Sequence, residues 1–194
     1  MPTYRDILEQ NCTGIAKIVL EGMRLHKVGV EGDIPIPHIP ILYRWWFPEN
    51  SEVLQTIRDF CLNDPELAGL LEKVDKRLID RKSYYALYFG KSNDGNRRFK
   101  NHISGNVHHS TLRLTLYGLC IDRHYDKVKE EQVSEILREC YFEWIPFTEE
   151  AVLVECLEGI CIAVGNYPLN IDGNPSISCA WRRHLLDVRN ISET

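Results

Sequence analysis

The segment "YYALYFGKSNDGNRRFKNHI", residues 84–103, carries the clearest chemical signal in the chain. An aromatic strand pattern ends at Gly90, a polar turn follows, and basic side chains then arrive at helical spacing. Between Lys91 and Arg113 there are five lysines and arginines and three histidines against one acid, Asp94. A strand, a turn and a helix in this order can bind an anion, because free backbone amides and the positive end of the helix dipole face it. The segment therefore predicts contact with a phosphate.

The turn by itself does not fix a function. "KSNDGN" lacks the glycine patterns of the P-loop and of dinucleotide-binding turns. A run of charges is usually exposed surface, so a solvated turn is the alternative interpretation. The chain as a whole has a net charge of -5, and acids outnumber bases between residues 122 and 158. A local basic surface on an acidic body suits the docking of a polyanion at one place, and argues against a sequence-independent nucleic-acid coat.

The elements that must position this segment alternate between helix and strand patterns. β-Branched and aromatic runs predict three strands, "ILYRWWF" at 41–47, "SYYALYFG" at 83–90 and "YFEWIPF" at 141–147. Apolar spacing and capping residues predict helices at 3–28, 51–82, 97–104, 110–121, 129–140, 148–164 and 180–190. Thr148 is expected to open the penultimate helix, with Glu149 and Glu150 in its first turn. We expect an α/β (α+β) fold in which helices flank a small, three-stranded, mainly antiparallel sheet.

Composition bounds the class of protein. A chain of 194 residues with a hydrophobic fraction of 44% suits one globular domain with appendages. No signal-peptide pattern and no apolar run of the roughly 18 residues that span a bilayer are found, so we expect a cytoplasmic protein without a membrane segment. The seven cysteines are scattered without a C-x-x-C pair, which predicts reduced thiols rather than a zinc site.

A wider pattern around the basic segment resembles the second half of the GIY-YIG nuclease signature. That signature has an aromatic strand ending in Tyr-aliphatic-Gly, a polar turn, an arginine, and a histidine four positions later in restriction-type members. In this chain Tyr88 and Gly90 end the strand, Arg98 follows the turn, and His102 takes the histidine position. "HHSTLR", residues 108–113, is similar to a segment found in one branch of the family.

The first half of the signature is an upstream strand with an aliphatic residue and a tyrosine. "PILYRWWFP" resembles it, with Tyr43 at the tyrosine position. The chain departs from the pattern in two ways, because Ile41 stands where the family has glycine and the predicted helices at 51–82 separate the two halves. A hairpin can carry such an insert at its tip, since the entropy of loop closure grows slowly with length.

The end of the resemblance is "TEEAVLVECLEGICIAVGNYPLN", which is similar to the last helix of the family and its closing turn. Glu155 matches the metal-binding glutamate, and Asn170 matches the closing asparagine. The resemblance covers about residues 38–172 and implies a nuclease domain there. An N-terminal helix and lead-in at 1–37 and a helical tail at 173–194 then lie outside it.

The resemblance implies a DNA endonuclease that hydrolyses phosphodiester bonds with one divalent ion, Mg²⁺ or Mn²⁺, on double-stranded DNA. Tyr43 would be the general base, its phenolate favoured by the metal and nearby cations, and Arg98 would clamp the phosphate as a bidentate fork. Glu155 would supply the hard oxygen that Mg²⁺ prefers. Tyr88 would orient water, His102 would accept or relay the proton, and Asn170 would hold the end of the helix. The substrate would be contacted by Lys91, Arg97, His108, His109 and Arg113. Cutting both strands commonly needs two active sites, so a homodimer is implied.

Two other functions fit the same residues. Ile41 and the insert at 51–82 could displace Tyr43, which would leave a non-catalytic nucleic-acid-binding module on the same scaffold. An enzyme acting on a small phosphorylated molecule is the third interpretation. The last predicted helix, "AWRRHLLDVRN", is equally open: it could present a basic face to DNA, or cover the sheet through Trp181, Leu185 and Val188.

Overall fold

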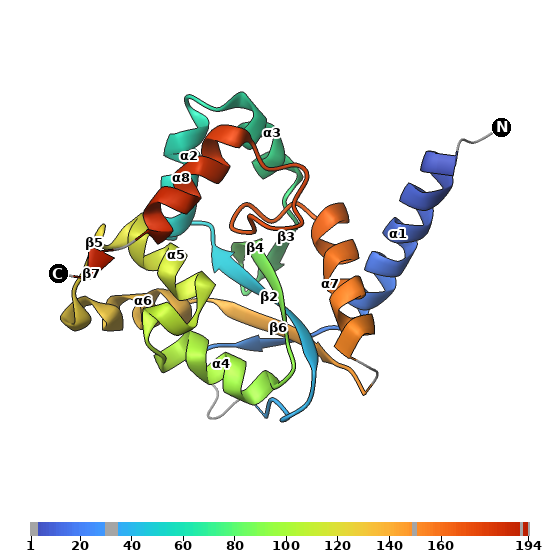
Figure 1. Ribbon diagram of the computed structural model, residues 1–194, viewed down its shortest axis with the longest axis horizontal. Coiled ribbons are helices and arrows are strands. Elements are labelled where there is room, and N and C mark those ends of the chain that lie inside the picture. The colour runs from blue at the N-terminus through green and yellow to red at the C-terminus, as the bar shows by residue number, and fades with distance from the viewer. Residues whose placement is uncertain (1–3, 30–34, 149–150, 191, 194) are drawn as a thin grey trace.

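The computed structural model describes residues 4–29, 35–148, 151–190 and 192–193 (Figure 1). The helices are α1 (Tyr4–Glu21), α2 (Glu52–Cys61), α3 (Pro65–Lys73), α4 (Gly95–Ser104), α5 (Thr111–Cys120), α6 (Glu130–Arg138), α7 (Ala151–Val164) and α8 (Cys179–Arg189), with short 3-10 turns η1 (Val107–His109) and η2 (Lys127–Lys129). The strands are β1 (Arg24–Lys27), β2 (Ile41–Pro48), β3 (Lys76–Ile79), β4 (Lys82–Ser92), β5 (His124–Tyr125), β6 (Tyr141–Pro146) and β7 (Ser192–Glu193). Within these ranges no helix is long and apolar enough to cross a membrane.

The main sheet is antiparallel and has the strand order β1-β6-β2-β4-β3. The predicted class is confirmed, but the expectation of three strands was too low by two. β1 lies where the first helix was expected to continue to residue 28, because α1 ends at Glu21 and the chain turns back to pair with β6. β3 lies at the end of the segment expected to be helical at 51–82, where it pairs with the start of β4.

The β3–β4 hairpin explains why its first strand was missed. Its two turn residues, Asp80 and Arg81, both have positive φ, at 48° and 65°. Two-residue hairpin turns of this kind usually contain Asn-Gly or Asp-Gly, since glycine adopts positive φ without strain. An Asp-Arg pair gives no such signal in the sequence.

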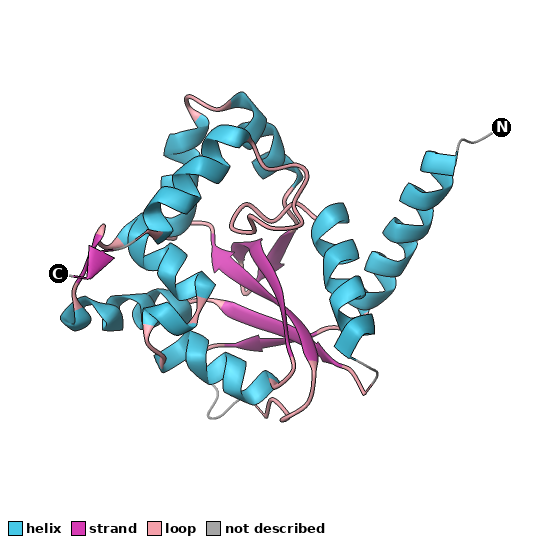
Figure 2. Cartoon of the chain, viewed as in Figure 1, coloured by secondary structure: helices cyan, strands magenta, loops and turns pink. Residues whose placement is uncertain are grey.

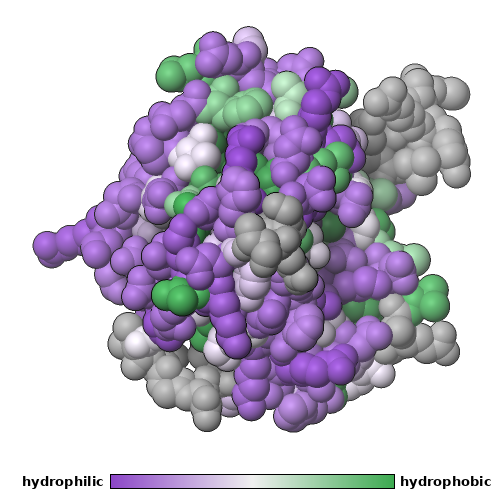
Figure 3. All heavy atoms as spheres, turned by 60° about the vertical axis from the view of Figure 1, so that its left-hand side comes forward, coloured by the Kyte–Doolittle hydropathy of each residue, from purple (hydrophilic) through white to green (hydrophobic). Residues whose placement is uncertain are grey.

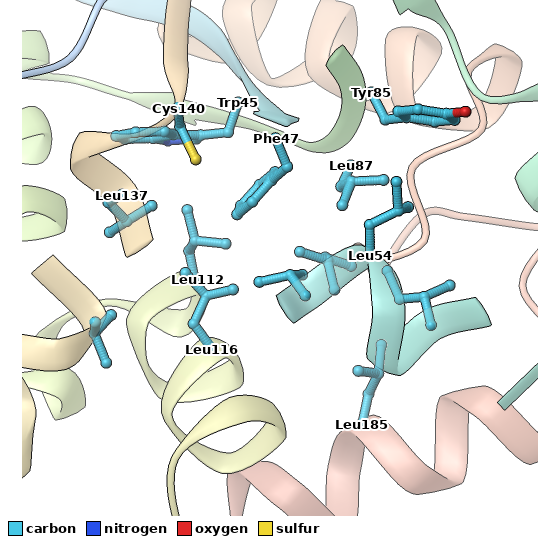
Figure 4. Close-up of a cluster of buried hydrophobic side chains, with 14 of the residues drawn as sticks. Trp45, Phe47, Leu54, Tyr85, Leu87, Leu112, Leu116, Leu137, Cys140 and Leu185 are labelled. Carbon is cyan, nitrogen blue, oxygen red and sulfur yellow. The ribbon is translucent and has the colours of Figure 1, made fainter. Parts of the chain in front are cut away.

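Helices cover both faces of the sheet (Figures 1 and 2). β2 alternates between them, so that Tyr43 and Trp45 pack into one core and Leu42 and Trp46 into another. The first core joins β2 to helices α2, α5, α6 and α8, and Figure 4 shows Trp45 and Phe47 beside leucines of those helices. The second core lies under α7 and the C-terminal half of α1. We call the face that carries Tyr43 the catalytic face, after the role expected of that residue.

The other predicted helices are found within a few residues of their expected bounds. Glu149 and Glu150, expected in the first turn of the long helix, lie outside the described residues. The last helix covers the catalytic face through Trp181, Leu185 and Val188, all at most 2% exposed. The surface in Figure 3 is mostly hydrophilic, with hydrophobic residues in small separate groups.

Candidate active site

The pairing of β2 with β4 brings the two halves of the sequence pattern together. Tyr43 lies directly opposite Gly90, and α2, α3 and β3 form an insert at the tip of this hairpin. A Cβ atom added to Gly90 would lie 2.8 Å from both Cζ and the hydroxyl oxygen of Tyr43. Glycine is therefore required at position 90, because the Tyr43 ring lies over its backbone. The insert at 51–82 does not separate Tyr43 from the basic segment.

Ile41, which stands where glycine was expected, is accommodated by another glycine. A Cβ atom on Gly95, at the start of α4, would lie 2.9 Å from the Cδ1 and Cγ2 atoms of Ile41. The isoleucine side chain therefore fills space that Gly95 leaves open. Ile41 is completely buried and keeps its place opposite Ser92 in the β2–β4 ladder, so it does not displace Tyr43.

His102 links Tyr43 to the next helix through buried hydrogen bonds. Its Nε2 lies 3.0 Å from the Tyr43 hydroxyl, and its Nδ1 lies 2.7 Å from Oγ of Ser110, the N-cap of α5. All three residues are at most 2% exposed. One ring nitrogen of a neutral histidine carries a proton, so His102 donates in one of these contacts and accepts in the other.

Tyr88 continues this chain of polar groups toward solvent. A β-bulge between β2 and β4 lets Leu87 and Tyr88 both lie on the catalytic face, whereas strict alternation would send one of them to the other side. The rings of Tyr43 and Tyr88 have centroids 6.4 Å apart, and the two phenols interact electrostatically. Tyr88 is half-buried and lines a cavity, so a row of polar side chains runs from Ser110 through His102 and Tyr43 to a phenol at the cavity wall.

Burial determines the protonation of this chain. Desolvation raises the pKa of Tyr43 well above its ordinary value, and the neighbouring Tyr88 raises it further, while Arg98 lowers it. Desolvation and then the charges of Arg98 and Arg113 hold the pKa of His102 well below its ordinary value. Tyr43 is therefore a neutral phenol and His102 a neutral imidazole at neutral pH. In the protein without a metal ion, desolvation outweighs the effect of Arg98, so nearby cations alone do not favour a Tyr43 phenolate. The expected phenolate included the contribution of a metal ion and stays a prediction.

Two glutamates, one helical turn apart on α7, line the same cavity. The Glu155 side chain is 70% exposed and pairs with Lys91, with 3.2 Å between Oε2 and Nζ. Glu158 is half-buried and interacts with the charges of Lys91 and Arg98. Burial raises the pKa of its carboxyl group, which Lys91 and Arg98 partly offset. The sequence prediction named only Glu155, although an acid within an apolar helix is a signal that applied equally to Glu158.

The cavity has a volume of about 370 Å³, and its polar lining comes from Tyr88, Glu155, Glu158, Asn170, Asp172 and Arg189. Asn170 fixes the segment that follows α7. Its Oδ1 accepts from the backbone N–H of Phe89, and its Nδ2 donates to the carbonyl of the same residue, both at 2.8 Å. The Asn170 side-chain amide thus makes the two hydrogen bonds to Phe89 that a neighbouring strand residue would make. It holds the segment that follows α7 against β4, next to Tyr88.

A sequence model described as "GIY-YIG catalytic domain" matches residues 41–191. This chain belongs to the GIY-YIG family. The match is to a family of nucleases, and it extends beyond residue 172 to include helix α8. No curated protein and no solved structure matches the chain.

The substrate-contacting residues expected from the GIY-YIG resemblance lie in different environments. Arg97, His108 and His109 are exposed, and Lys91 is half-buried beside Glu155. Arg113 is 1% exposed, and its guanidinium donates to the carbonyl oxygens of His102, Ile103 and Glu130 and to Ser134 Oγ. The expectation that Arg113 contacts DNA is therefore wrong: it is a buried residue that holds the backbone of His102.

The donor atoms around the cavity fit a hard divalent ion. Within the described ranges, no three histidine, cysteine, aspartate or glutamate side chains are grouped to hold a metal by themselves. Glu155 and Glu158 nevertheless offer carboxylate oxygens to one cavity, and the charge of Glu155 contributes to raising the pKa of Glu158. Mg²⁺ usually binds through one or two carboxylates and takes its other ligands from water and substrate phosphate. This donor set is of that kind.

Proposed function

We propose that this GIY-YIG protein is a metal-dependent DNA endonuclease that hydrolyses phosphodiester bonds. The observation that supports this most strongly is the row of polar side chains Ser110, His102, Tyr43 and Tyr88, which leads from the core to a cavity lined by carboxylates. A histidine that only packed the core would need no such row. The row offers a path for removing a proton from water at the cavity.

The chain itself performs the proton transfer in this mechanism. Water held at the Tyr88 hydroxyl gives up its proton to the tyrosine pair as it attacks phosphorus. Tyr43 passes a proton to His102 Nε2 at the same time, because its raised pKa makes a free phenolate unfavourable. His102 is neutral, so its Nε2 lone pair is free to accept this proton, and its Nδ1–H donates to Ser110; the same burial makes the imidazolium costly, so it exists only transiently. Gly90 and Asn170 hold the two tyrosines in place.

The charged residues bind the scissile phosphate. Arg98, from α4, is half-buried, and its charge acts on Tyr43, Tyr88 and Glu158; we therefore assign to its guanidinium the role of clamping phosphate oxygens beside the tyrosines. We assign the metal-binding role chiefly to Glu158, with the more exposed Glu155 as an outer carboxylate. Bound there, Mg²⁺ or Mn²⁺ would stabilise negative charge on the phosphate and on the leaving oxygen.

A comparison of the two glutamates tests this function. Purified protein with Mg²⁺ should nick or linearise plasmid DNA, and excess chelator should stop the reaction. We expect Glu158→Gln to lower the single-turnover rate by at least about 100-fold, as for loss of a group that stabilises transition-state charge. Glu155→Gln, the matched control one helical turn away, should keep the rate within about tenfold, because its carboxylate is mostly solvated.

The outcomes separate the candidate functions. Plasmid binding without cleavage, with any of several divalent ions, would replace the nuclease by a nucleic-acid-binding module. A larger loss in Glu155→Gln than in Glu158→Gln would return the metal-binding role to Glu155. Full activity in both variants would reject a carboxylate-bound metal at this cavity.

A further inference from the structure

Helix α8 ends at the candidate active site, and its last residue, Arg189, lines the cavity together with Tyr88. Its Nε donates to Thr115 Oγ1 at 2.7 Å, and its Nη2 donates to the carbonyl oxygen of Leu169 at 3.0 Å. Thr115 is completely buried in α5, and Leu169 directly precedes Asn170. The guanidinium is therefore held by two acceptors, one on α5 and one in the segment that follows α7.

The charge of Arg189 is not balanced by a nearby acid. No carboxylate in the described part of the chain lies within ion-pair distance of it, and Asp172 acts on it only at longer range. No residue in the described part of the chain accepts a hydrogen bond from Nη1 of Arg189 either. Burial of this half-buried group lowers its pKa, so the charged form is held at a cost. A cation in this position favours an anion as its partner, since pairing offsets the desolvation of the charge.

We propose that Arg189 is a second phosphate-binding arginine of this site, in addition to Arg98. The inference rests on the proposed nuclease function and extends it to helix α8, which carries none of the residues of the GIY-YIG signature discussed above. The two arginines come from different helices, α4 and α8, and both charges act on Tyr88, that of Arg189 more strongly. A phosphate that enters the cavity beside Tyr88 meets a fixed guanidinium with one nitrogen still available.

This assignment joins the two interpretations of the last helix. Trp181, Leu185 and Val188 lie on the buried side of α8 and cover the sheet, as the structural interpretation required. Arg189 follows them and turns into the cavity, as the DNA-contact interpretation required. Arg183 on the same helix is exposed and does not line the cavity, which makes it the matched control.

The test measures binding and cutting separately. Binding of a short DNA duplex is measured in chelator over a range of salt concentrations, so that no cleavage occurs. Loss of one phosphate contact reduces the slope of log K against log[salt] by about 0.9. We expect Arg189→Met to show this reduction and to bind about 10–100-fold more weakly, the usual effect of losing a charge-assisted hydrogen bond. Arg183→Met should keep the wild-type slope.

A lysine variant separates the charge from the fork geometry. Arg189→Lys keeps the charge and should keep the salt slope, but should bind about tenfold more weakly and cut more slowly than wild type, because lysine cannot reproduce two fixed donors. A merely structural role for Arg189 would change thermal stability without changing the slope. If Arg189→Met does not fold, the lysine variant decides, and wild-type affinity and rate in it would overturn the proposal.

The two proposals fail in different ways. Wild-type protein that binds the duplex but never cuts it would contradict the nuclease, while the slope difference between Arg189→Met and Arg183→Met would still support or overturn the role of Arg189. Equal slopes for these two variants would show that α8 contributes only diffuse positive charge. Absence of any DNA binding by the wild type would overturn both.

Discussion

Two consecutive residues of β2, Tyr43 and Arg44, lie on opposite faces of the same sheet and in opposite electrostatic situations. Arg44 lies on the α1–α7 side, where its Nε donates to Glu143 and its Nη1 donates to Asp75 at 2.8 Å. Glu143 also accepts from Trp46 at 2.9 Å and from Arg77 at 3.0 Å. The two guanidinium groups stack on the Trp46 ring, 4.5 and 4.7 Å from its centroid. This network is closed, because each charge has its partner within the protein.

The catalytic face is open by comparison. Its buried hydrogen bonds run from Ser110 through His102 to Tyr43, whose ring lies next to that of Tyr88 at the edge of a cavity. Arg98 and Arg189 have no carboxylate within ion-pair distance among the described residues. A buried charge therefore does not mark a functional site by itself. The informative feature is hydrogen-bonding or charge capacity that the fold leaves unsatisfied, since folded proteins otherwise pair such groups.

The largest effect should come from breaking the open chain at its centre. Tyr43→Phe keeps the ring over Gly90 and removes only the hydroxyl that contacts His102. We expect the single-turnover cleavage rate to fall by about 10²–10⁴-fold, the usual contribution of a general base. The free energy of unfolding, measured by urea titration, should change far less than the activation free energy. A variant that cuts at the wild-type rate would show that Tyr43 only packs.

The closed network should respond in the opposite way. Glu143→Gln preserves the side-chain volume but leaves the charges of Arg44 and Arg77 without their shared partner. We expect the free energy of unfolding to fall by about 3–5 kcal/mol, as for other buried ion pairs that lose one member. Any cleavage defect should disappear under conditions where the variant is fully folded.

A surface ion pair gives the control for this variant. Glu131 lies 2.7 Å from Arg138, and its side chain is 62% exposed. Glu131→Gln should therefore change the free energy of unfolding by less than about 1 kcal/mol, because solvent screens the pair. Similar losses in Glu131→Gln and Glu143→Gln would remove the distinction between the closed network and ordinary surface charge.

The smallest effect expected for the residues around Tyr43 is a dependence of stability on pH. The pKa of His102 is held well below its ordinary value in the fold, whereas the unfolded chain binds a proton near pH 6.5. As pH falls below that value the unfolded state gains a proton that the folded state lacks, so stability falls by up to about 1.4 kcal/mol per pH unit until the folded pKa is reached. Above pH 6.5 this contribution is constant.

His102→Asn isolates the effect, since the other histidines are shared by both proteins. The free energy of unfolding, measured by urea titration, should fall more between pH 7 and pH 5 for the wild type than for His102→Asn. The same depression of the His102 pKa predicts that the acid limb of the cleavage profile lies below pH 6.5. Equal pH dependence in the two proteins would mean that His102 titrates normally and is not desolvated.

The sequence by itself determined the elements with strong local patterns and the residues that those elements place at fixed spacing. Tyr43 and Tyr88 follow from two aromatic strands, and Gly90 and His102 follow from the turn and helix after them. Such patterns report local geometry, because side chains alternate along a strand and repeat every turn along a helix. The class of fold and the family follow from them.

Only the tertiary structure decided which charged residues are satisfied. No local pattern in the sequence distinguishes the environment of Arg113 from that of Arg189. In the fold, Arg113 is buried among carbonyl oxygens, whereas Arg189 lines the cavity. The sequence also gives no reason to prefer Glu158 over Glu155, which differ in the neighbours that β4 and α4 bring to them. Burial and charge pairing depend on contacts between residues distant in the chain, and those contacts exist only once the sheet and its helices have packed.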